Sequence, residues 1–244
     1  MSKWIIHKDA ETAKDYKGEE PIMNGFACKD EANATAEDFF FAGLAKPGLT
    51  NNTFGSLVTA ANVQKIPGLK TLRVSLARID YSPGGINPPH THPRATEIVF
   101  VLEGSLDVGF ITTANKLISK TIVKGDVYVF PKGLVHFQKN NGKVPAAVIA
   151  GFNSQLQGTA NITLTLFAAT PPVSNDVLTS TFLVETKEIE NMTQRALLQA
   201  TDIVDSFRRP DAGYLSKRKS CVLSIFVCWW SAFLSWISRV LCLI

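Results

Sequence analysis

Short apolar runs, separated by glycine, proline and asparagine, fill the middle of the chain. The runs that we expect to form strands cover residues 71–81, 97–102, 106–111, 117–123, 127–130, 135–138, 147–152 and 162–167. Turn residues at Gly104, Gly125, Gly133 and 140–142 separate several of them at nearly regular spacing. Short strands at regular spacing are typical of an antiparallel sandwich or barrel, whereas βαβ units would place helices between strands. The pattern therefore predicts an all-β fold.

The first of these runs predicts how side chains divide between core and solvent. In residues 71–81, Leu72, Val74 and Leu76 alternate with polar residues. Because successive side chains of a strand point to opposite faces, we expect these three on the buried face of a half-buried strand. An outer strand is expected before it, within residues 48–66.

The N-terminal part is less regular. Residues 1–24 are mostly polar and charged, which predicts a loosely attached leader. Residues 33–44 are expected to form a short helix or loop that packs a cluster of phenylalanines on the core. Thr35 precedes Asp38 by three residues, a spacing compatible with a capped helix start.

The C-terminal part has a different pattern. Beyond residue 172, Val184, Ile189, Met192 and Leu197 recur at helical spacing, which predicts one or two amphipathic helices that pack on the barrel or on a second subunit. We divide the rest into a basic linker (201–220) and an apolar tail (221–244) with one charge. This tail is long enough to cross a bilayer. Two interpretations stay open: a membrane anchor, or the product of an altered gene model.

Composition narrows the class of protein. The chain has 244 residues, of which 45% are apolar, so one sizeable β domain is the favoured arrangement. The net charge of +4 is concentrated in the C-terminal basic cluster, and the central region has no basic stripe interleaved with aromatics, so we expect no nucleic-acid partner. The four cysteines show no Cys-x-x-Cys pair, which indicates neither a structural zinc site nor a disulfide framework. The glycan-acceptor triplets begin at Asn33, Asn51, Asn161 and Asn191.

The histidines carry the candidate chemistry. His90 and His92 are one residue apart, and in an extended segment both side chains project to the same side. Glu97 is five residues beyond His92, so a turn at 93–95 is needed to bring its carboxylate to that side. His136 lies on a later strand that can lie opposite the His90 strand in a closed β-fold.

These four side chains would offer three nitrogens and one carboxylate oxygen to a metal ion. Such a set suits a six-coordinate Mn²⁺ or Fe²⁺ better than zinc, which prefers four ligands, or magnesium and calcium, which prefer oxygen. Interior apolar residues would exclude bulk water from the site. The residues expected in that role are Val99, Val101, Val108 and Phe137.

Two segments resemble the signature boxes of the cupin superfamily. The first reads G-x5-H-x-H-x4-E-x6-G over residues 84–104, and the second reads G-x5-P-x-G-x2-H-x3-N over residues 125–140. The segments NPPHTHPRATE and FPKGLVHFQ resemble those of plant germin-like proteins in particular. The resemblance covers residues from about 28 to 198, and we assign residues 25–200 to the germin-like domain.

The resemblance implies a cupin jelly-roll β-barrel with manganese held by His90, His92, Glu97 and His136. It also implies C-terminal helices in oligomer contacts, as a homo-trimer or hexamer, and residence in the extracellular matrix or apoplast. Germins usually begin with a signal peptide and a cysteine that pairs with the equivalent of Cys28. The first residues here show neither, so Cys28 is expected to lack that partner, and a replaced first exon is the simplest explanation.

Three functions follow from this resemblance. The first is a manganese oxidoreductase that dismutates superoxide, acting through the four metal ligands. The second is oxalate oxidase: Asn87 could contact an anion on the metal, but oxalate-oxidising germins have a second asparagine at the position of Ala77, and alanine has no side-chain donor. The third is a non-catalytic, wall-associated binding protein whose metal only stabilises the barrel.

Overall fold

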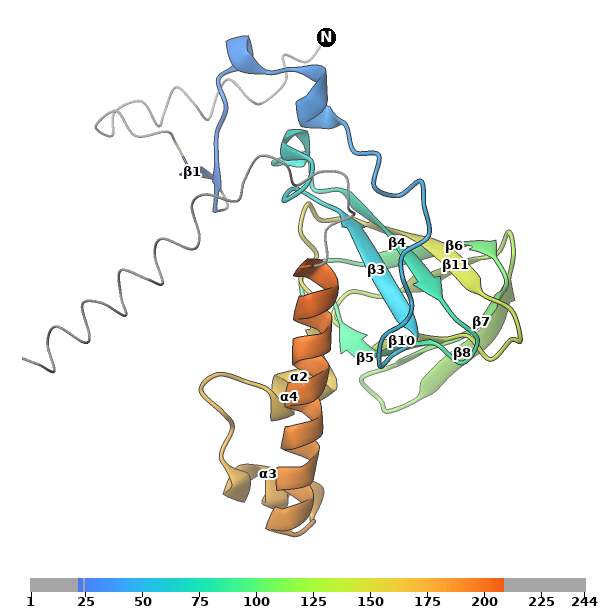
Figure 1. Cartoon of the computed structure of the whole chain (residues 1–244), viewed down its shortest axis with the longest axis vertical. Helices are drawn as coiled ribbons and strands as arrows, with labels where there is room; N and C mark the ends of the chain where they lie inside the picture. The colour runs from blue at the N-terminus through green and yellow to red at the C-terminus, as the bar shows by residue number, and fades with distance from the viewer. Residues whose placement is uncertain (1–21, 24, 209–244) are drawn as a thin grey trace, which may run out of the picture. The chain divides into compact units, whose positions relative to one another are not determined.

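The computed structural model describes residues 22–23 and 25–208, and within this part the fold is mostly β (Figure 1). The chain divides into two units between Ala200 and Thr201, and the described residues up to Ala200 form one compact unit. The predicted leader and apolar tail lie almost wholly outside the described residues. The described helices include none that is long and apolar enough to cross a membrane.

Two five-stranded antiparallel sheets face each other. The first sheet, in spatial order, contains β12 (Ala160–Asn161), β5 (Ile86–Thr91), β10 (His136–Lys139), β7 (Ser105–Ile111) and β8 (Leu117–Val123). The second contains β3 (Ser56–Ala61), β4 (Ser75–Tyr81), β11 (Ala146–Phe152), β6 (Glu97–Glu103) and β9 (Val127–Phe130). The predicted all-β jelly-roll is therefore confirmed, and the predicted outer strand is β3, at the edge of its sheet.

The remaining elements precede and follow the barrel. They are the hairpin β1 (Ile22–Met23) and β2 (Phe26–Ala27), the 3₁₀ helices η1 (Glu31–Asn33), η2 (Ala36–Phe39) and η3 (Pro67–Leu69), and the helices α2 (Ile162–Phe167), α3 (Asn175–Phe182) and α4 (Thr186–Arg208). The helices predicted beyond residue 172 are α3 and α4. Of the four residues that predicted them, Ile189 is fully buried, whereas Met192 and Leu197 are exposed.

The barrel core lies between the two sheets. Strands of both sheets contribute small and branched side chains that alternate with solvent-facing residues, as period-two strands require. Its members include Ile79, Val99, Val101, Leu106, Val108, Ile122, Val148 and Ala150. A second, smaller cluster joins the three helices through Phe167, Leu178, Ile189 and Ala196.

The predicted buried face of the first strand was wrong. The strand begins only at Ser75, because Thr71 and Arg73 have left-handed backbone angles that an extended strand cannot contain. Its buried residues are the set of opposite parity, which includes Ile79, while Leu72, Val74 and Leu76 are 41%, 49% and 47% exposed. A shift of one residue in register exchanges the two faces of a strand.

Two other local predictions were also wrong. Residues 162–167, expected as a strand, form α2, and the side chain of Asn161 caps this helix by accepting a hydrogen bond from the Leu164 N–H. The phenylalanine cluster is not packed on the barrel core, because Phe39 and Phe40 are more than half exposed. The predicted capped start at Thr35 is present, since the Thr35 N–H donates to Asp38 at 2.7 Å.

Cys28 is half-buried and forms no disulfide within the described residues. The ammonium of Lys70 lies 2.8 Å from its sulfur and donates to the Phe26 carbonyl at 2.7 Å. The thiol is thus paired with a cation.

The observed register of β4 gives a direct test. Ile79→Ala removes a side chain that is 2% exposed and should lower the free energy of unfolding by about 2–5 kcal/mol, because it leaves a cavity between the sheets. Leu76→Ala, at a position of the same strand that is 47% exposed, should lower it by under about 1 kcal/mol. Urea unfolding in dilute protein measures both. A larger loss for Leu76→Ala than for Ile79→Ala would contradict the observed register.

Candidate metal centre

Two neighbouring strands of one sheet carry two of the histidines, and the third directly follows one of these strands. His90 on β5 is the direct antiparallel partner of His136 on β10. β5 ends at Thr91, and His92 follows immediately, before a turn at Pro93 and Arg94. The turn predicted between the histidine pair and the carboxylate is therefore present.

Glu97 comes from the facing sheet. It is the first residue of β6, and its register partners are Phe130 on β9 and Phe152 on β11. The sequence predicted that the His136 strand lies opposite the His90 strand. In the structure those two strands are adjacent, and the carboxylate is the group that approaches from the opposite side of the barrel.

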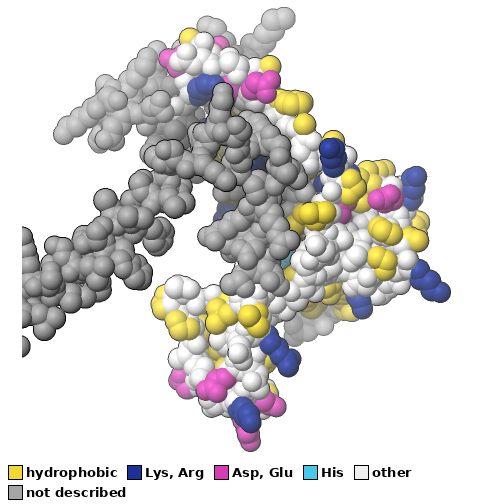
Figure 2. Space-filling model, in the orientation of Figure 1, with side chains coloured by type: hydrophobic (Ala, Val, Ile, Leu, Met, Phe, Trp, Pro, Cys, Tyr) yellow, Lys and Arg dark blue, Asp and Glu magenta, His cyan; other side chains and the backbone are white. Residues whose placement is uncertain are grey.

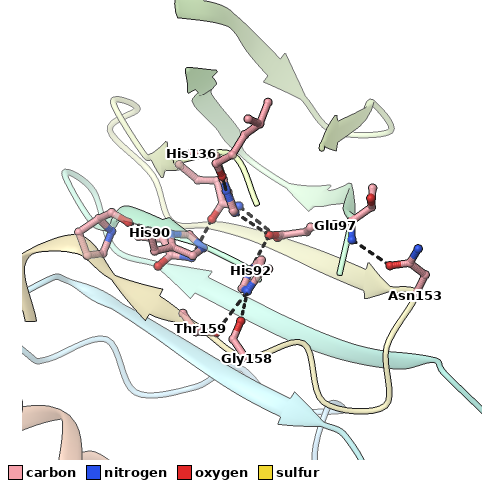
Figure 3. Close-up of polar contacts among 12 residues, drawn as sticks. His90, His92, Glu97, His136, Asn153, Gly158 and Thr159 are labelled. Atoms are coloured by element: carbon pink, nitrogen blue, oxygen red, sulfur yellow. Dashed lines mark hydrogen bonds and ion pairs between the residues drawn. The ribbon is translucent and has the colours of Figure 1, made fainter. Parts of the chain in front are cut away.

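The four side chains converge in the interior (Figure 3). One potential ligand atom from each lies within 4.8 Å of the other three. Nε2 of His92 and Nε2 of His136 are each 3.0 Å from the same oxygen, Oε2 of Glu97. All four residues are at most 4% exposed, so bulk water does not surround them.

Backbone carbonyls fix the orientation of all three imidazoles. Nδ1 of His90 is 2.7 Å from the carbonyl of Pro88, and Nδ1 of His136 is 2.9 Å from that of Leu134. Nδ1 of His92 is 2.9 Å from a third carbonyl, that of Gly158. A carbonyl oxygen only accepts, so each Nδ1 carries a hydrogen and each Nε2 of a neutral ring carries a lone pair.

This arrangement fits a cation. Three Nε2 lone pairs and a carboxylate oxygen are all acceptors, and buried acceptors that face one another are unfavourable without a positive charge between them. Either additional protons on the imidazoles or a bound metal ion supplies that charge. His90, His92, Glu97 and His136 could thus hold a metal ion, with the Nδ1–carbonyl contacts as the outer shell that metal-binding histidines commonly have.

The pKa directions agree with a neutral imidazole beside an ionised acid. Burial, followed by the charge of His136, lowers the pKa of His90 to about 3. Burial alone would raise the pKa of Glu97, but the hydrogen bonds and charges of His136 and His92 lower it to about 2. Glu97 is therefore a carboxylate at neutral pH, as metal coordination requires.

Gln138 supports the carboxylate, and the sequence analysis missed it. Its Nε2 donates to Oε1 of Glu97 at 3.2 Å, and its Oε1 accepts from Tyr81 at 2.8 Å and from Asn87 at 2.9 Å. Burial raises the pKa of Tyr81 well above its ordinary value, so its hydroxyl remains a donor. One signal was available: Gln138 follows His136 by two residues on one strand and so faces the same side.

Asn87 reaches the interior through an irregularity of β5. His90 pairs with His136, but Asn87, three residues earlier, pairs with Gln138, only two residues later. One extra residue of β5 is accommodated at 88–89, where two prolines lack the N–H groups of a regular ladder. The side chain of Asn87 contacts Gln138; its contact with an anion stays a prediction.

The apolar lining matches the prediction in part. Val99, Val101 and Val108 are fully buried, as predicted. Phe137 is only half-buried, because it neighbours His136 on the strand and therefore points to the other face. The aromatic neighbours of the site are instead Phe130 and Phe152. The ring of Phe130 stacks on that of His136, with 4.6 Å between the ring centres, and the ring of Phe152 lies edge-on to that of His92, with 5.0 Å between the ring centres.

A barrel of two antiparallel sheets with an interior His₃Glu cluster is the arrangement of a metal-binding cupin, and a sequence profile of the Cupin family matches residues 42–190. The rhicadhesin receptor of Pisum sativum is 71% identical over 174 residues, which cover 71% of this chain and 80% of the relative. Germin-like protein subfamily 2 member 1 of Arabidopsis thaliana is 72% identical over 160 residues, 66% of this chain and 73% of the relative. The chain belongs to the germin-like proteins of plants, within the cupin family.

A solved structure gives the same fold. Recombinant oxalate oxidase in complex with glycolate superposes with a TM-score of 0.70 at 42% sequence identity, covering 75% of this chain and 92% of that one. The fold over most of the chain is therefore shared with oxalate oxidase.

The lowered pKa of His90 predicts a pH dependence of the metal-free protein. Between the ordinary value of 6.5 and about 3, the unfolded state binds a proton at His90 that the folded state does not, so stability falls as pH falls. The loss should be about 1.4 kcal/mol per pH unit. Urea unfolding between pH 6.5 and 4.5 measures this loss. This range lies at or above the ordinary pKa of Glu97, 4.5, so the titration of Glu97 contributes little to the slope. In His90→Gln this slope should be smaller, and an unchanged slope would contradict the assignment.

Proposed function

We propose that this protein is a manganese-binding germin-like oxidoreductase that dismutates superoxide to dioxygen and hydrogen peroxide. The observation that carries the proposal is the convergence of His90, His92, His136 and Glu97 at one buried point, with every Nδ1 held by a backbone carbonyl so that the Nε2 atoms could bind a cation. Bound manganese would supply the one-electron redox cycle that dismutation needs.

The residues of the chain have separate tasks in this proposal. The three imidazoles and the carboxylate would hold the ion, and the mixed N₃O set favours manganese or iron over zinc. Gln138 keeps the Glu97 carboxylate oriented through a hydrogen bond to the oxygen that does not face His92 and His136. Phe130 and Phe152 limit the entry of bulk water beside the imidazoles. A small diatomic anion suits an interior site of this kind.

Removal of a ligand should abolish both metal and activity. His90→Ala and Glu97→Ala each delete one of the converging groups, so bound manganese should fall to background and superoxide turnover by at least about 100-fold. Elemental analysis of the purified protein, joined to a superoxide assay, measures both. Lys120→Ala, on the edge strand β8, is the matched control and should retain both. Full activity in the two ligand variants without metal would reject the proposal.

Oxalate oxidation is the second candidate. It is favoured by the similarity to oxalate oxidase in complex with glycolate and by the presence of Asn87 beside the ligands. Against it, Ala77 is fully buried and offers no donor where oxalate-oxidising germins have asparagine. We therefore expect no peroxide release when oxalate is added to the manganese-loaded protein. Release at a rate above that of a ligand variant would favour oxalate oxidase instead.

A non-catalytic role is the third candidate. Any ion that binds only the folded state stabilises it, by about 2.7 kcal/mol at a free concentration 100 times the Kd. A rise in melting temperature with Mn²⁺, together with no turnover of superoxide or oxalate, would identify this role.

We also propose residence in the plant extracellular matrix, as the resemblance implies. Asn33, Asn51 and Asn191 of the glycan-acceptor triplets are exposed, so a glycan could be attached there without disturbing the barrel. The predicted membrane anchor concerns residues 221–244, outside the described part. It stays a prediction.

A homo-oligomer, a trimer or hexamer by resemblance, is supported by an apolar surface on the second sheet. Leu76, Ile98 and Val129 lie in one row across β4, β6 and β9, and Leu76 and Ile98 meet over Gly151 of β11. The three are 46–48% exposed. Figure 2 shows, in yellow, that apolar side chains reach the surface at several places on one face of the molecule. A contiguous apolar patch of this kind is typical of an association surface.

Charge on this surface should separate the subunits. Ile98→Lys places an ammonium in the apolar row and should shift the mass measured by light scattering toward that of a monomer, because the charge would be desolvated in a contact. Lys120→Ala is again the control. An unchanged mass in Ile98→Lys would exclude this face from the contact.

A further inference from the structure

His92 differs from the other two histidines in how it is held. Nδ1 of His90 and Nδ1 of His136 donate to carbonyls two residues earlier in their own segments. Nδ1 of His92 donates to the carbonyl of Gly158, which is 66 residues away in sequence. The orientation of His92 therefore depends on the loop after β11, residues 153–159.

This loop is attached to the short segment that follows His92. The Thr96 N–H donates to the side chain of Asn153 at 2.8 Å, and the Arg94 N–H donates to the carbonyl of Gln157 at 3.2 Å. The Arg94 side chain adds a third contact, from Nε to the carbonyl of Leu156 at 2.7 Å. Two of these three hydrogen bonds come from one residue, which lies two positions beyond the ligand.

The guanidinium of Arg94 also packs directly on Gly158. A Cβ at position 158 would lie 2.7–2.9 Å from Nη2, Cζ and Nη1 of Arg94, and the backbone there has φ +64°, which favours glycine. The planar group therefore covers the residue whose carbonyl receives the His92 hydrogen. Arg94 thus contacts the backbone on both sides of Gln157, at the Leu156 carbonyl and at Gly158. These two contacts hold this stretch of the loop in place.

Other hydrogen bonds hold the start of the loop: Ser75 Oγ donates to the Ser154 carbonyl at 2.7 Å, and the Val63 N–H donates to the Gln155 carbonyl at 3.1 Å. Within the described residues, Oε1 of Gln157 is buried without a hydrogen-bond partner, so this side chain does not replace the Arg94 contact through that atom. Thr159 lies 3.4 Å from Nδ1 of His92, longer than the 2.9 Å to the Gly158 carbonyl. The Gly158 carbonyl is thus the main acceptor for His92.

We propose that Arg94 is a positioning residue for the metal centre: it clamps residues 156–158 so that the Gly158 carbonyl holds the Nδ1–H of His92 and directs Nε2 toward Glu97. The inference rests on the proposed metal site but not on its substrate. It assigns to an exposed arginine a role in the geometry of a buried ligand that it does not touch.

The contact between His92 and the loop can be tested without any metal. Imidazole ¹⁵N–¹H spectra of ¹⁵N-histidine-labelled, metal-free protein report whether each Nδ1–H is protected from exchange. In Arg94→Ala we expect the His92 signal to lose protection while the His90 and His136 signals persist, because their acceptors lie in their own segments. Those two signals are internal controls for the fold.

Metal affinity gives the second readout. Calorimetric titration of the metal-free protein with Mn²⁺ should show a raised Kd in Arg94→Ala, by up to about 10- to 100-fold, which is the effect of losing an outer-shell contact such as that of the Gly158 carbonyl. Arg94→Met keeps the aliphatic stem without the donor and should match Arg94→Ala. Arg94→Lys restores a donor and should recover part of the affinity. Lys120→Ala removes a positive charge at a distance and should bind as the wild type does.

Three outcomes would overturn the proposal: a protected His92 Nδ1–H with wild-type affinity in Arg94→Ala, loss of all three Nδ1–H signals together, or no recovery in Arg94→Lys. The second outcome would show a merely structural role for Arg94. Failure of the proposed function is distinguishable, because a wild-type protein that binds Mn²⁺ without turnover leaves both readouts intact. A wild type that binds no Mn²⁺ still reports the His92 contact through its spectrum.

Discussion

The structure depends on one electrostatic constraint: three imidazole lone pairs and a carboxylate meet where water cannot surround them. His90, His92, His136 and Glu97 are buried, and each Nδ1 is already committed to a backbone carbonyl. Acceptors in this arrangement repel unless positive charge lies between them. The barrel stabilises the arrangement from outside, and a cation or added protons must stabilise it from within. This requirement explains why the groups around the site are donors and carbonyls in fixed positions rather than a fully apolar core.

The same constraint joins the two sheets. The histidine strands β5 and β10 belong to one sheet, while Glu97 begins a strand of the other. Gln138 also crosses this gap, because it lies on β10 and donates to Glu97. A group that neutralises the site would therefore act as a link between the sheets. Its effect on stability and its effect on chemistry have one origin, so metal-dependent melting alone does not separate an enzyme from a metal-stabilised barrel.

The fold class and the convergence of the four side chains could be predicted from the sequence, through local alternation and through the resemblance of residues 84–104 and 125–140 to two known sequence boxes. Alternation along a strand places His90 and His92 together, and turn residues mark the ends of the strands. The errors arose where a local irregularity overrides alternation. Left-handed residues before β4 leave Leu72 and Val74 outside the strand, and an asparagine cap begins a helix at residue 162. Gly158 could not be predicted as a partner of His92, since no local pattern joins residues 66 positions apart.

Superoxide and oxalate differ in how many hydrogen-bond donors they need from the interior, in addition to the groups that would bind the metal. Oxalate presents four oxygens, and a buried site must supply donors to replace the water that they lose. Ala77 supplies none, and one of the two hydrogens on Nδ2 of Asn87 is donated to Gln138, which in turn orients Glu97. Superoxide is smaller and carries a single charge, so attraction to a bound cation compensates for more of its desolvation. Asn87 and Gln138 thus orient the Glu97 carboxylate, and this arrangement supports the proposed superoxide reaction more than the oxidation of oxalate.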